Sequence, residues 1–98
     1  MCMKLRDIND ALAAGDRETM RQGFRALVDQ HARVEASSPG MLVVALNRLC
    51  TALKDDQAQM PPAICGALDL PAGSTYADGT TQAKRDAPRL ARHLTAAG

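Results

Sequence analysis

Apolar residues recur at helical spacing along most of the chain. A first helix is predicted over residues 3–14, with Leu5, Ile8 and Leu12 at i, i+3 and i+7 on one side. Gly15 is a typical helix stop, and Asp16 is a typical N-cap for a second helix over 17–36. The second helix has the clearest amphipathic pattern, because one face collects Met20, Phe24, Leu27, Val28, His31 and Val34.

A third helix is predicted over 39–56, after a break in which Ser38 can act as the cap and Pro39 as the first helical residue. Its broad apolar stripe consists of Leu42, Ala45, Leu46, Leu49, Cys50 and Leu53. Val43 and Val44 extend apolar character to the other side. We therefore expect this helix to be central and the most buried.

The second half of the chain is less regular. A short helix is predicted over 62–69, and a last helix over 82–96. Between them, the Gly, Pro, Ser and Thr residues of 71–81 predict a mobile loop. Pro88 either follows a helix start near Asp86 or kinks the last helix, because an interior proline loses a backbone hydrogen bond.

Composition supports an all-α fold. The chain of 98 residues has one Phe, one Tyr and no Trp, so its core must consist of Leu, Val, Ile, Met and Ala. Such residues suit closely packed helices better than a β-sandwich. We expect a single domain over 1–98, a compact bundle of four to five short helices with a mobile loop before the last one.

Charge, apolar segments and cysteine content indicate where the protein is located and what it does not bind. A net charge of +1 gives no overall field toward nucleic acid or anionic lipid. Residues 1–7 lack the apolar segment of a signal peptide, and no stretch has 18 apolar residues, so we expect a cytoplasmic protein with no membrane partner. Three cysteines without a C-x-x-C pair predict neither disulfides nor a zinc site. Arg outnumbers Lys nine to three, which is typical of high-GC bacterial or phage genomes.

No motif for catalysis, cofactor binding or metal binding stands out, so we expect no enzyme and no cofactor. His31 on the apolar face of the second helix is interpreted as a core histidine, and Cys50 as a small hydrophobe. Cys2 is expected to be exposed, while Asp55 and Asp56 at a helix end are expected to be solvated charges. His93 and Cys65 suggest no chemistry.

Two rows of arginines have helical spacing. Arg85, Arg89 and Arg92 share one side of the predicted last helix and could contact phosphates or an acidic partner. Their alternative interpretation is an ordinary solvated face. The second row consists of Arg17, Arg21 and Arg25 on the second helix, and acidic neighbours favour a solvated face there.

The string Ile64-Cys-Gly-Ala-Leu-Asp-Leu-Pro-Ala-Gly-Ser-Thr-Tyr76 resembles the short helix, the turn and the start of the recognition helix in bacterial helix-turn-helix repressors. The resemblance covers 13 residues and implies that Ser74, Thr75 and Tyr76 contact bases or phosphates. The string carries one inserted residue, and residues 77–79 (Ala-Asp-Gly) would break a recognition helix. A loop with chance similarity is the preferred interpretation.

The function hypothesis is a small non-enzymatic protein–protein interaction module: an adaptor, an inhibitor or a subunit. A short chain with a strongly apolar central helix tends to leave apolar surface uncovered, and such surface often forms interfaces. The candidate interface residues are Met41, Val43, Val44 and Met60. A protein partner is expected, with a homodimer as one form of it. The alternative is a nucleic-acid-binding regulator that uses Arg85, Arg89 and Arg92.

Overall fold

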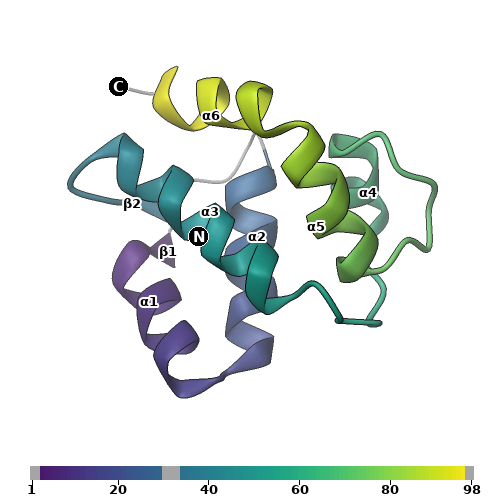
Figure 1. Ribbon diagram of the computed structural model, residues 1–98, viewed down its shortest axis with the longest axis horizontal. Coiled ribbons are helices and arrows are strands. Elements are labelled where there is room, and N and C mark those ends of the chain that lie inside the picture. The colour runs from purple at the N-terminus through teal and green to yellow at the C-terminus, as the bar shows by residue number, and fades with distance from the viewer. Residues whose placement is uncertain (1–2, 30–33, 97–98) are drawn as a thin grey trace.

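The computed structural model describes residues 3–29 and 34–96, which form six helices and a two-stranded sheet (Figure 1). The all-α prediction is confirmed, with more helices than the four or five expected. In chain order the elements are β1 (Met3–Lys4), α1 (Leu5–Ala14), α2 (Arg17–Val28), β2 (Val34–Glu35), α3 (Pro39–Ala52), α4 (Pro62–Ala67), α5 (Tyr76–Arg85) and α6 (Ala87–Ala96).

The first two helices meet at a tight corner that follows the sequence signals. Gly15 adopts the left-handed conformation with φ 71°, which glycine tolerates best, and so ends α1. Asp16 caps α2, because its carboxylate accepts hydrogen bonds from the Thr19 amide (3.3 Å) and hydroxyl (2.6 Å). The two helices then pack so closely that a Cβ on Gly23 would lie 2.9 Å from Cγ1 of Ile8. The predicted stop and cap are both confirmed.

The predicted second helix over 17–36 is too long. α2 ends at Val28, and Val34 and Glu35 instead pair in parallel with Met3 and Lys4. The same pairing takes the first two residues of the predicted first helix, so that α1 begins at Leu5 rather than at residue 3. At both places, backbone pairing between segments that are distant in sequence occurs where the apolar spacing predicted a helix. His31 lies outside the described residues.

α3 occupies the centre of the fold, as the apolar stripe predicted. In Figure 1 it crosses the middle of the view, with α1 below it, α6 above it and α4 and α5 to the right. It packs on α1, α2, α5 and α6, and its stripe residues are all buried. The helix ends at Ala52, short of the predicted residue 56, and a turn follows it. Among the described residues no helix is long and apolar enough to cross a membrane.

The prediction of a mobile loop over 71–81 is wrong for residues 76–81, which are helical. α5 begins at Tyr76, because Thr75 and Asp78 form a reciprocal capping box: the Thr75 hydroxyl accepts from the Asp78 amide at 3.2 Å, and the Asp78 carboxylate accepts from the Thr75 amide at 3.1 Å. Gly79 does not break the helix. It lies under Met60, whose sulfur would be 2.6 Å from a Cβ at that position.

The predicted last helix over 82–96 is two helices. α5 ends at Arg85, and α6 starts at Ala87 after the single residue Asp86. Pro88 stands in the first turn of α6, where a missing amide hydrogen costs no helical hydrogen bond, so it accompanies a helix start rather than a kink. Leu90 and Leu94 are buried where α6 packs on α3.

Candidate interaction surfaces

Two large apolar side chains stand exposed on neighbouring turns of α3. Met41 is 46% exposed and Val44 is 58% exposed, and they are the exposed large hydrophobic residues of the described chain. We call this pair the α3 patch. Their i, i+3 spacing places them on one face of the helix. Of the four predicted interface residues, the structure brings these two together.

The other two predicted interface residues lie elsewhere. Val43 is half-buried against the edge of the core. Met60 is only 3% exposed, and its side chain lies against Gly79 of α5, so its assignment to an exposed interface is wrong. The physical reason is helix α5, whose start the sequence analysis did not predict. Gly79 of this helix has no side chain, so the Met60 side chain can pack there.

The exposed neighbours of the α3 patch along α3 include one charged side chain, that of Arg48. Gly40 and Asn47 are exposed next to it, one residue before Met41 and three after Val44. Arg48 follows Val44 by one turn, and its Nη1 donates to Oδ1 of Asn9 on α1 at 3.1 Å. These neighbours therefore add a single positive charge beside the two apolar side chains.

The predicted basic face of Arg85, Arg89 and Arg92 does not exist as one helix face. Arg85 ends α5, whereas the other two belong to α6. Arg89 donates to Oδ2 of Asp86 at 2.6 Å and to the carbonyl oxygen of Ala67 at 3.2 Å, so it joins α6 to α4. Arg85 and Arg92 are exposed. The break at Asp86 and the internal pairing of Arg89 correct the sequence prediction.

The segment that resembles a helix-turn-helix runs from within α4 to the first residue of α5, and its polar groups are used internally. The Tyr76 side chain is 2% exposed and its hydroxyl accepts from Arg25 Nη1 at 2.6 Å. The Thr75 hydroxyl caps α5, and the Ser74 hydroxyl donates to the carbonyl of Pro71 at 2.7 Å. These three side chains are thus occupied by contacts that shape the fold.

The arginine row on α2 is not simply a solvated face. Arg21 makes a two-pronged contact with Asp56, with Nε to Oδ2 at 2.7 Å and Nη2 to Oδ1 at 3.1 Å. The Asp56 side chain is only 2% exposed and also lies 3.6 Å from Arg17. Burial alone would raise the pKa of Asp56, but the hydrogen bonds from Arg21 and the Ala58 amide hold it below its usual value. The prediction that Asp56 is a solvated charge is wrong.

The cysteines of the described chain are buried and unpaired. Burial raises the pKa of the Cys50 thiol to about 11, which keeps it protonated and a poor nucleophile near neutral pH. Cys65 is buried with its sulfur 3.8 Å from the carbonyl of Met60. Cys2 lies outside the described residues. No group of His, Cys, Asp and Glu among the described residues is arranged to hold a metal ion.

Comparison with known proteins finds no matching family model, no matching curated protein and no matching solved structure.

Proposed function

We propose that this protein is a small, non-enzymatic, cytoplasmic protein–protein interaction module and that the α3 patch is its contact surface. The observation that carries the proposal is the joint exposure of Met41 and Val44 on the helix that otherwise forms the centre of the core. Removing apolar surface from water is favourable by about 25 cal/mol per Å². A partner that covers both side chains would therefore form a more stable complex. Contiguous apolar surface that stays exposed marks many protein–protein interaction sites.

The chemistry of the patch favours a different protein with an apolar, uncharged helix face. A second copy of this chain would add only the same two apolar side chains, whereas a stable dimer buries roughly 1,200–2,000 Å². A larger partner can add a polar rim around the apolar centre. Because the contact depends on burial rather than charge, we expect its affinity to change little with salt.

The test is a comparative capture from lysate. Tagged wild type, Val44→Asp and Ala63→Asp are used as baits after nuclease treatment, at about 0.15 M and 0.5 M salt. Ala63→Asp is the matched control, because it adds the same charge at an exposed position on α4. We expect one stoichiometric protein with wild type and the control at both salt concentrations and its loss with Val44→Asp. Equal capture by all three baits would contradict the assignment of the patch.

A second candidate function, nucleic-acid binding, is favoured by one observation. Lys84, Arg85 and Arg92 are exposed and make no ion pair with a carboxylate among the described residues. Three phosphate contacts would give a log–log slope of binding against salt of about −3. Replacing these three residues by Ala would abolish that binding and leave the Arg89 contacts intact. A binding activity without this salt dependence would exclude this alternative.

A further inference from the structure

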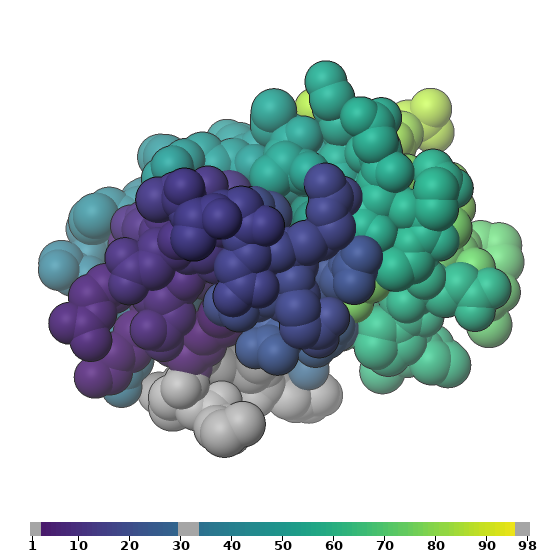
Figure 2. Space-filling view, turned by 90° about the horizontal axis from the view of Figure 1, so that it is seen from below, coloured from purple at the N-terminus to yellow at the C-terminus, as the bar shows by residue number. Residues whose placement is uncertain are grey.

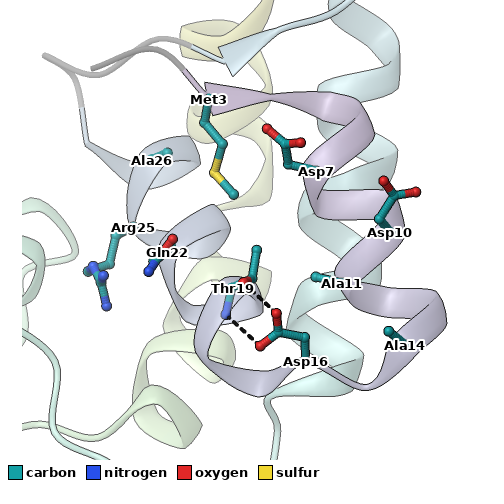
Figure 3. A pocket seen from close by; sticks show the side chains of 10 residues that line it. All are labelled: Met3, Asp7, Asp10, Ala11, Ala14, Asp16, Thr19, Gln22, Arg25 and Ala26. Atoms are coloured by element: carbon teal, nitrogen blue, oxygen red, sulfur yellow. Dashed lines mark hydrogen bonds between the residues drawn. The ribbon is translucent and has the colours of Figure 1, made fainter.

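A groove of about 740 Å³ opens between α1 and α2 (Figure 3). Both helices reach the surface of the molecule when it is seen from below (Figure 2). Residues from β1, α1, the corner between the helices and α2 line the groove: Met3, Asp7, Asp10, Ala11, Ala14, Asp16, Thr19, Gln22, Arg25 and Ala26. It shares no residue with the α3 patch, so it is a separate site.

The inner surface of the groove is apolar and made of small side chains. Ala11 of α1 is buried and Ala26 of α2 is half-buried, and Ala14 continues the α1 side one turn on. The Met3 side chain points from β1 into the space between the two helices (Figure 3). Alanines leave room for large apolar side chains from outside, and a flexible thioether can adjust to them.

The rim of the groove is acidic. Asp7 and Asp10 stand on the α1 side, and Asp16 closes the end at the corner (Figure 3). Hydrogen bonds from the Thr19 side chain and amide lower the pKa of Asp16, which keeps it ionised. The Asp10 side chain is exposed and makes no hydrogen bond or ion pair among the described residues.

The one cationic side chain of the lining does not neutralise this rim. Arg25 is directed away from the groove in Figure 3, and its Nη1 donates to the Tyr76 hydroxyl at 2.6 Å. The α2 side of the rim otherwise presents the uncharged Thr19 and Gln22. The groove therefore combines an apolar floor with three carboxylates that make no ion pair among the described residues.

We infer that this groove binds a cationic amphipathic helix of another protein. The lining spans Asp7 to Ala14 on α1, which at 1.5 Å per residue is about 10 Å, or two helical turns. The occupant is thus a helix whose Leu- or Met-type residues at i, i+3 or i+4, and i+7 face the alanines while its Lys or Arg residues face the carboxylates. A second copy is a poor occupant, because the leucines of its basic helix α6 are buried against α3.

The test uses a labelled 14-residue Leu/Lys helical peptide with the purified protein. Fluorescence anisotropy gives its affinity, and ¹⁵N NMR shifts give its location. We expect shifts in α1 and α2, and about tenfold weaker binding to Asp10→Lys, because the attraction between the residue 10 side chain and a peptide lysine becomes a repulsion. Asp55→Lys is the matched control, since it makes the same charge change at another exposed site and should bind as wild type does.

Two further peptides test the apolar contacts and the charge contacts separately. A peptide with Ser in place of Leu keeps the charge and should not bind, and one with Glu in place of Lys should not bind either. Equal weakening by Asp10→Lys and Asp55→Lys, equal binding of the Ser peptide, or shifts confined to other surfaces would each overturn the inference. Val44→Asp should leave peptide binding unchanged, so failure here and failure of the α3 patch are distinguishable.

Discussion

At the scale of single residues, Asp56 is the most consequential polar group in the described chain. Its carboxylate accepts from Arg21 and from the Ala58 amide, and its backbone carbonyl accepts from the Ala77 amide at 2.9 Å. One residue therefore joins α2, the segment after α3 and the first turn of α5. Arg21 also lies over the Tyr76 ring at 5.9 Å, which adds a cation–π contact to the same junction.

Asp56→Asn should destabilise the protein by about 2 kcal/mol. The amide keeps an acceptor for the Ala58 amide but removes the charge that pairs with Arg21, and the partial exposure of Arg21 reduces the penalty of a fully buried ion. Urea unfolding followed by circular dichroism measures the change. Asp55→Asn, at the exposed neighbouring position, should stay within about 0.5 kcal/mol of wild type. Equal effects of the two variants would show that the ion pair contributes nothing.

The same carboxylate makes stability depend on acid pH. Because the pKa of Asp56 is lowered in the folded state, the unfolded state takes up the proton first as pH falls. The stabilisation is complete above the unfolded value of about 3.9 and is lost as pH decreases through the folded value. The difference in unfolding free energy between wild type and Asp56→Asn should thus be constant above about pH 5 and shrink below about pH 4. A difference that is flat down to pH 2 would contradict this role.

At the scale of elements, boundaries follow local signals where caps are present in the sequence. Gly15 and Asp16 predicted the corner between α1 and α2, and Pro39 predicted the start of α3. The start of α5 carried an equally good signal, the Thr75 to Asp78 capping box, but Gly79 obscured it. That glycine is explained only by packing, since Met60 fills the space beside it.

Glycines in helices should respond to alanine according to their neighbours. Gly23→Ala gains helix propensity but places a Cβ 2.9 Å from the stiff Ile8 side chain, so we expect a net loss of about 1–2 kcal/mol. Gly66→Ala in α4 meets nothing within 4 Å and should stabilise by up to about 1 kcal/mol. Thermal unfolding of both variants provides the comparison. A stabilising Gly23→Ala would mean that α1 and α2 pack less closely than described.

At the scale of the whole molecule, the helical class and the central α3 follow from periodicity and composition, whereas the surfaces follow from tertiary contacts. The exposed Met41 and Val44 were identifiable because they lie off the main apolar stripe. The burial of Met60 and the pairing of β1 with β2 depend on segments distant in sequence, which no local pattern encodes. One wall of the groove could be recognised in the sequence. Its residues on α1 share one side of the helix at i, i+3, i+4 and i+7: Asp7, Asp10, Ala11 and Ala14.

The most direct measurement of the proposed interaction is site-specific photo-crosslinking in cells. A photoreactive phenylalanine analogue replaces Val44 on the α3 patch in one protein and Ala63 on α4 in another, and crosslinked products are identified by mass spectrometry. An interaction module that uses the α3 patch predicts one protein product from position 44 and none from position 63. No protein product from position 44, or the same products from both positions, would contradict it.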